Sequence, residues 1–164
     1  MILKSFLTKT PPARGQVRFF LVAAAACDLA VAALHVYIIA QGAWAYRWFG
    51  AGEDMARWAE EGSPIPALVT SGIVIACLLA AAYYVCAAAG WRPPLLRTGL
   101  VAVAAVYMVR ATALAAPVVG VSLSPFMLWT SLVSLAFGLV HVTGTYLYWR
   151  ATRRPAADTV ERGF

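Results

Sequence analysis

Four ionisable side chains lie within long apolar stretches of this 164-residue sequence: Asp28, His35, Arg110 and His141. Charged groups are costly in an apolar environment. In membrane proteins they therefore face the protein interior, pair with one another and mark ligand or proton pathways. We predict that these four residues, together with Tyr107, line a ligand-binding site or a proton path.

Helical spacing predicts how these residues meet. Asp28 and His35 lie seven residues apart, or two helical turns, and so share one helix face, as do Tyr107 and Arg110 on another stretch. With a rise of about 1.5 Å per residue, Asp28 and Arg110 differ in depth by only about 5 Å. An isolated charge at that depth would need a partner. We predict an ion pair between Asp28 and Arg110 with His141 as its third member, which either forms part of a site or only ties two helices together.

Other chemistries have less support. The three cysteines lie inside apolar stretches without a CxxC motif, which is typical of buried structural thiols. His35 and His141 differ in depth by about 12 Å, which disfavours a shared haem. The sequence shows no metal-ligand spacing and no nucleophile beside a base. We therefore expect no catalytic residue, no metal and no cofactor, and we favour a non-enzymatic protein.

The apolar stretches themselves define the fold. Hydrophobic residues make up 62% of the chain and charged residues 12%, about half the charged fraction of a soluble protein. Four stretches are long enough for a bilayer core of about 30 Å, and we place them at 18–41, 66–89, 95–117 and 125–149. We predict an all-α bundle of four transmembrane helices as a single domain over 1–150, followed by a disordered tail at 151–164.

The charge distribution predicts the topology. Basic residues collect before the first span, in the 90–97 turn and after the last span, whereas the 43–65 loop is acidic. Because basic segments stay on the cytoplasmic side, we expect both termini in the cytoplasm and the 43–65 loop in the periplasm of a bacterial inner membrane. The net charge of +6 then reflects topology and lipid headgroups, and we expect no nucleic-acid partner.

The 43–65 loop contains one short helical pattern at 53–61. Met55, Trp58 and Ala59 share a face at helical spacing, so the segment is expected to be amphipathic. Together with Trp58, the side chains of Trp44 and Trp48 place aromatic rings at the depth of the lipid headgroups. We predict that these tryptophans belong either to an interfacial anchor or to a lid over a site in the bundle.

Several short segments resemble a known family. They are Gln41–Gly42, AYRWFG at 45–50, GSPIP at 62–66 and GWRPP at 90–94. Over roughly residues 18–115 the chain thereby resembles the DoxX-like proteins. That resemblance implies a small four-helix protein of the bacterial inner membrane, and, by analogy with some members, an accessory subunit of a membrane oxidoreductase.

Three functional hypotheses follow. The first is a binding or transport module whose intramembrane Asp/Arg/His site takes a small molecule, a lipid or a quinone. The second is an accessory or scaffold subunit of a larger membrane complex, with a homodimer as the simplest assembly. The third is a membrane enzyme acting on lipid or quinone. In each of them the lipid bilayer is the main partner.

Overall fold

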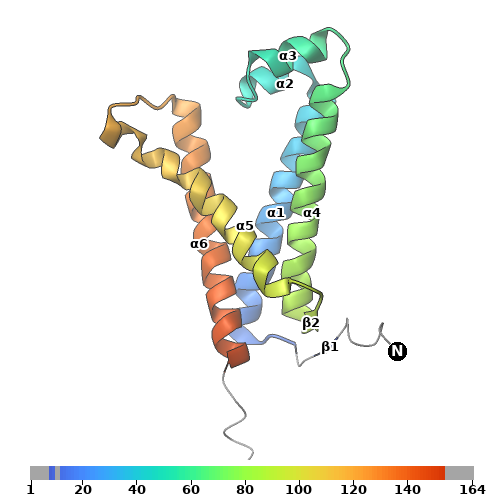
Figure 1. The fold of residues 1–164 in the computed structure, drawn as a ribbon, viewed down its shortest axis with the longest axis vertical. Coiled ribbons are helices and arrows are strands. Elements are labelled where there is room, and N and C mark those ends of the chain that lie inside the picture. The colour runs from blue at the N-terminus through green and yellow to red at the C-terminus, as the bar shows by residue number, and fades with distance from the viewer. Residues whose placement is uncertain (1–7, 10–11, 154–164) are drawn as a thin grey trace, which may run out of the picture.

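The computed structural model describes residues 8–9 and 12–153, which are almost entirely helical (Figure 1). Its long helices are α1 (Gly15–Gln41), α4 (Ile65–Ala89), α5 (Leu96–Ala111) and α6 (Pro125–Arg153). A 3₁₀-helix, η2 (Thr112–Val119), continues α5. Counting α5 and η2 as one span, four helices are long and apolar enough to cross a membrane. The predicted all-α four-helix fold is confirmed.

Prolines and glycines set the ends of these helices. Pro66 lies in the first turn of α4, and Gly90 ends α4 in the left-handed conformation, with φ of +80°. The α-helix predicted to run to residue 117 stops instead at Ala111. Pro117 has no N–H, and its ring would clash with the carbonyl of an α-helical turn, so the chain continues in the tighter 3₁₀ form.

The last helix is longer than predicted. α6 continues past residue 149 to Arg153, into the segment expected to be a disordered tail. The rest of that predicted tail, 154–164, lies outside the described residues.

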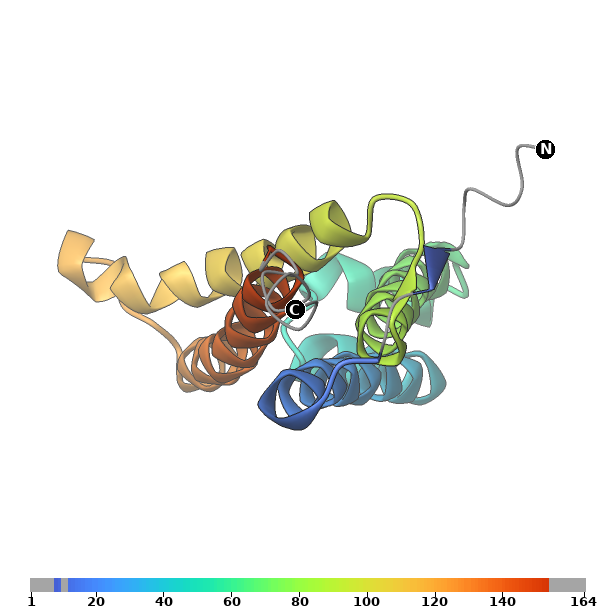
Figure 2. The ribbon, with the colours of Figure 1, turned by 90° about the horizontal axis from the view of Figure 1, so that it is seen from below.

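The long helices associate as two pairs. α1 packs along α4, and α5 packs along α6, while α1 also contacts α6. The two pairs diverge toward the end of the bundle that carries the short helices (Figure 1), and in the end-on view α5 runs along one side of the bundle at an angle to α6 (Figure 2). α1 and α6 lie close together at Gly144, where a Cβ atom would lie 3.3 Å from the backbone of Phe20. This contact brings the second turn of α1 against the C-terminal third of α6.

The described N-terminal segment, the 91–92 turn and the end of α6 lie at one end of the bundle (Figure 1). There β1 (Thr8–Lys9) pairs antiparallel with β2 (Trp91–Arg92), and the N–H of Ala13 donates to the carbonyl of Ala88 at 3.1 Å. The sequence did not predict this strand pair. It does bring together segments that were expected to share one side of the membrane.

Two short helices, α2 (Ala43–Trp48) and α3 (Glu53–Glu60), form the opposite end. The predicted helix at 53–61 is α3, whereas α2 was not predicted. Buried Ala56, with Met55 and Ala59 beside it, packs α3 onto a small core that includes Ile38 and Tyr46. We refer to α2 and α3 together, residues 43–60, as the elbow.

The tryptophans of the elbow differ in exposure. Trp44 and Trp48 are 55% and 65% exposed, and their rings stack with centroids 6.1 Å apart. Trp58 is half-buried. Exposed stacked indoles at the end of a membrane bundle fit the headgroup region.

Candidate functional site

Asp28 lies in the middle of α1, 13 residues from either end of that helix. Its side chain is only 1% exposed. Oδ1 accepts a hydrogen bond from the hydroxyl of Tyr107 on α5 at 3.0 Å and lies 3.2 Å from Nε2 of His141 on α6. His141 is fully buried. Three of the predicted site residues therefore meet at the centre of the bundle.

The second ring nitrogen of His141, Nδ1, has a hydrogen-bond partner within α6. Nδ1 lies 2.7 Å from the carbonyl oxygen of Phe137. A carbonyl can only accept, so Nδ1 carries a hydrogen. Nε2 then either carries a second hydrogen toward the Asp28 carboxylate or accepts one from protonated Asp28. A hydrogen bond between Nε2 and Oδ1 at 3.2 Å requires one proton between these two atoms, and with that proton the pair has no net charge.

Two tyrosine rings hold the imidazole in place. The Tyr107 ring is tilted by 33° against His141, with centroids 4.6 Å apart, and the buried Tyr84 ring of α4 meets it edge-on at 4.9 Å. The Tyr84 hydroxyl donates to the carbonyl of Leu100 at 3.0 Å and lies 3.0 Å from Oγ1 of Thr145. All four long helices thus contribute polar side chains around His141, in two sets of hydrogen bonds that meet where the Tyr84 ring contacts the imidazole. We call Asp28, Tyr84, Tyr107, His141 and Thr145 the Asp28 cluster.

One oxygen of this network is not paired. Oδ2 of Asp28 is buried and has no hydrogen-bond partner within 8–9 and 12–153. A buried polar atom without a partner costs about 1–3 kcal/mol, and such atoms in folded proteins often mark functional positions. The cluster therefore presents one carboxylate oxygen that can still accept a hydrogen bond.

The predicted ion pair between Asp28 and Arg110 is wrong. In the part of the chain that the structure describes, Arg110 makes no ion pair with Asp28; it is exposed and donates from Nη2 to Oγ1 of Thr130 at 3.2 Å. Depth alone did not settle the pairing, because Tyr107 takes the inward position on α5. The longer Arg110 side chain extends along α6 to Thr130, five residues from the start of that helix, where the guanidinium can approach the aqueous side. His141, expected as a third member, is the actual partner of Asp28.

His35 does not join the cluster. Its ring is half-buried, and Nδ1 lies 2.8 Å from the carbonyl oxygen of Val31 in its own helix. It lies two helical turns beyond Asp28. The structure therefore assigns it to α1 itself and not to a contact with the site.

Tyr84 and Thr145 were missing from the predicted site, although the sequence carries a signal for both. Tyr84 lies seven residues after Cys77 on the second span, and Thr145 lies four residues after His141. Both spacings place a polar group on the inward stripe of its helix. Only the packing of α4 against α5 and α6 shows that the two hydroxyls meet.

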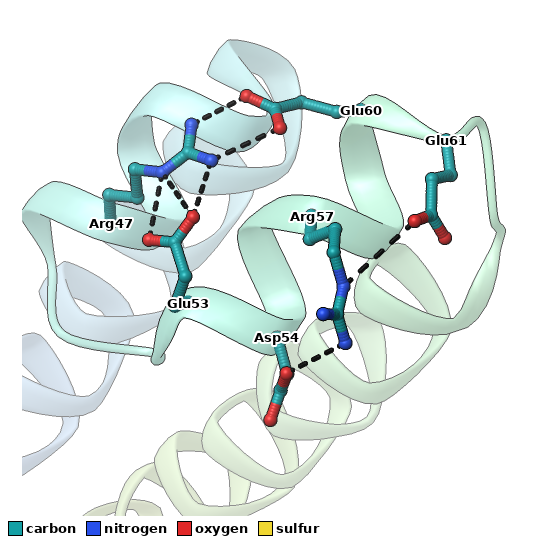
Figure 3. A network of polar contacts seen from close by, with 6 residues as sticks. All are labelled: Arg47, Glu53, Asp54, Arg57, Glu60 and Glu61. Atoms are coloured by element: carbon teal, nitrogen blue, oxygen red, sulfur yellow. Dashed lines mark hydrogen bonds and ion pairs between the residues drawn. The ribbon is translucent and has the colours of Figure 1, made fainter.

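A separate network of charges holds the elbow together (Figure 3). Arg47 on α2 forms ion pairs with Glu53 and Glu60 on α3, each at 2.6 Å. These hydrogen bonds lower the pKa of the Glu53 and Glu60 carboxyls and raise that of Arg47. A second arginine, Arg57, bonds Asp54 at 2.9 Å. Because Arg47 lies on α2 and both of its partners lie on α3, it fixes the angle between the two helices.

The elbow also reaches across to the other helix pair. A Cβ atom at Gly50 would lie 2.7 Å from the ring of Phe126 at the start of α6. The elbow therefore touches α6 where the α1–α4 and α5–α6 pairs have diverged (Figure 1). This contact links the elbow to the start of α6.

The described residues do not include a group of side chains suited to hold a metal ion. Across the described ranges, no group of three or more His, Cys, Asp or Glu side chains is arranged to hold a metal ion. Both nitrogens of His141 are occupied by Asp28 and Phe137.

No protein-family model matches this chain, and no curated protein or solved structure matches it either. The resemblance to DoxX-like proteins stays a prediction. The function has to be argued from the geometry of the Asp28 cluster.

Proposed function

We propose that this protein is a non-enzymatic membrane module that binds or transports a small molecule at the Asp28 cluster. The observation that carries this proposal is the buried Oδ2 of Asp28, which has no partner among the described residues although the other oxygen has two. A purely structural helix tie would satisfy both oxygens. A carboxylate that keeps one acceptor unused is suited to a ligand.

The two ends of the bundle differ in how closely the helix pairs lie. The two helix pairs diverge toward the elbow (Figure 1), while at the other end α1 and α6 are in close contact at Gly144. The elbow bridges the divergent end through Gly50 and Phe126. In the proposed function the ligand enters beneath the elbow, which acts as the outer lid.

The proposal includes a location. The basic N-terminal and 90–97 segments and the C-terminal end of α6 favour the cytoplasmic side, and the acidic elbow favours the periplasm. We place the chain in a bacterial inner membrane with both termini in the cytoplasm, in line with its resemblance to DoxX-like proteins.

Native mass spectrometry tests the proposed function. The full chain would be extracted gently from its own membrane, as wild type, as Asp28→Asn and as the control Asp54→Asn, which changes an exposed carboxylate of α3. We expect a bound small molecule on the wild type and on Asp54→Asn that is absent from Asp28→Asn. A wild-type protein without such a molecule, or one that Asp28→Asn retains equally, contradicts the proposal.

A second candidate function rests on Arg110. This arginine is exposed on a helix that is long and apolar enough to span a membrane, between the exposed apolar side chains of Val106, Val109 and Trp129. Thr130 is its only hydrogen-bond partner within the described part of the chain. An accessory subunit that offers Arg110 to an acidic group of a neighbouring membrane protein would explain this position. A photo-crosslinker at Val109 should then capture a polypeptide in the native membrane; capture of lipid alone argues against it.

A further inference from the structure

The chemistry of the Asp28 cluster also indicates which class of molecule it takes; this step rests on the proposed function. Nδ1 of His141 is committed to the Phe137 carbonyl, so the Asp28–His141 pair holds one shared proton. With that proton the pair is neutral. Without it the buried site would carry one uncompensated negative charge, which is very costly in an apolar interior.

No fixed positive charge is available among the described residues to replace that proton. The groups that interact electrostatically with Asp28 are the thiols of Cys27 on α1 and Cys77 on α4, the phenols of Tyr84 and Tyr107, and His141 itself. Ordinary thiols and phenols are uncharged near neutral pH. The nearest arginine on α5, Arg110, bonds Thr130 instead. Only a positively charged ligand can therefore take the place of the proton at no cost in net charge.

From this geometry we infer that the Asp28 cluster binds a protonated amine in exchange for the proton shared by Asp28 and His141. The ammonium donates an N–H to Oδ2 of Asp28, and the shared proton leaves to water. His141 is then neutral, with Nε2 as a second acceptor. One cation enters and one proton leaves, so the net charge of the buried site does not change.

The lining of the site favours an organic ammonium over a metal ion. A divalent metal needs about six oxygen ligands, whereas the cluster offers one carboxylate and a few hydroxyls. The rings of Tyr84 and Tyr107 adjoin His141, and the Phe137 ring lies beside Tyr107 with centroids 6.0 Å apart. Aromatic faces attract cations by about 0.5–2 kcal/mol. An amine with an apolar body would use both the carboxylate and these rings.

Isothermal titration calorimetry on the full chain in detergent tests the exchange. Benzylammonium and butylammonium would be titrated in two buffers that differ in ionisation enthalpy, which gives the number of protons released. We expect about one proton released for each ammonium bound, and an apparent affinity that rises about tenfold per pH unit while the pair is protonated. Asp28→Asn should lose both effects, and Asp54→Asn should keep them.

Two further measurements make the result decisive. Circular dichroism during unfolding in sodium dodecyl sulfate shows whether Asp28→Asn is still folded, which separates loss of exchange from loss of fold. Benzyl alcohol, a neutral analogue of benzylammonium, should not bind by displacing a proton. Ammonium binding without proton release, or no binding by either amine, overturns the inference. If native mass spectrometry nonetheless shows a neutral molecule that depends on Asp28, the proposed function stands and only the exchange is wrong.

Discussion

Gly144 is a position where an added side chain would push α1 away from α6. A Cβ atom there would lie 3.3 Å from the carbonyl carbon and oxygen of Phe20 and 3.5 Å from the nitrogen of Leu21. Optimal carbon contacts are about 3.5–4.0 Å, and helix backbone cannot move aside as a flexible side chain can. In Gly144→Val the γ-carbons lie about 1.5 Å farther out, so α1 would have to withdraw from α6 by about 1–2 Å.

This withdrawal has a calculable effect on Asp28 and His141. Their Oδ1–Nε2 distance of 3.2 Å would increase to about 4 Å or more, beyond the range of a hydrogen bond. Overpacking costs about 1–3 kcal/mol, to which the lost contact adds about 1 kcal/mol. We therefore expect Gly144→Val to reduce the free energy of unfolding by about 2–4 kcal/mol.

The matched control is Gly72→Val. Gly72 also lies inside a long helix, but a Cβ atom at this position would meet no heavy atom of another described element within 4 Å. Unfolding in sodium dodecyl sulfate, followed by circular dichroism, measures both variants in the same detergent. Equal stability of the two variants would refute the close approach of α1 and α6, and with it the geometry of the Asp28 cluster.

Three further predictions concern single side chains. Tyr107→Phe removes only the donor to Asp28 and should lower the free energy of unfolding by about 0.5–1.5 kcal/mol; a loss above about 3 kcal/mol would mean that the hydroxyl has other partners. The free energy of unfolding of Arg110→Gln should stay within about 0.5 kcal/mol of the wild-type value because the side chain is exposed. Strong destabilisation would indicate that Arg110 does pair with Asp28. The pKa of Glu53 and of Glu60 is lowered by Arg47, so the stability that they give the elbow is present above their usual pKa and is lost as the pH falls through the lowered values. After correction for intrinsic exchange, amide hydrogen exchange in 43–60 should therefore accelerate in acid in the wild type and in Arg57→Gln. In Arg47→Gln, exchange should be fast at every pH. If Arg47→Gln shows the same pH response as the wild type, the ion pairs of Arg47 with Glu53 and Glu60 do not hold the elbow.

Much of the fold could be predicted from the sequence because lipid-spanning helices leave a strong signal. Runs of apolar residues bounded by Pro66, Gly90 and Pro125 located the four spans within a few residues. The change to 3₁₀ geometry after Ala111 could not be predicted as readily, since Pro117 is compatible with either a helix end or a tighter turn. The pairing of β1 with β2 depends on tertiary contacts that two short polar segments do not reveal.

The candidate site was predicted in part. Asp28, Tyr107 and His141 were found because buried ionisable and polar groups at similar depth must find partners. Arg110 was placed wrongly because it was expected to share the inward face of Tyr107, whereas its side chain is exposed and turns to Thr130. A long flexible side chain also reaches about 6–7 Å from its helix, which makes its partner hard to assign from spacing alone.

The contact between Asp28 and His141 is the central feature of the site, and nitrogen NMR of the histidine ring tests it most directly. The chain has two histidines, so His35→Gln in ¹⁵N-histidine-labelled protein leaves the signals of His141 alone. We predict a protonated Nδ1 and an Nε2 whose shift reports a proton shared with a carboxylate, and an Nε2 shift that changes in Asp28→Asn. An imidazole with unprotonated Nδ1, or one that titrates freely with the solvent and ignores Asp28→Asn, would contradict the shared proton.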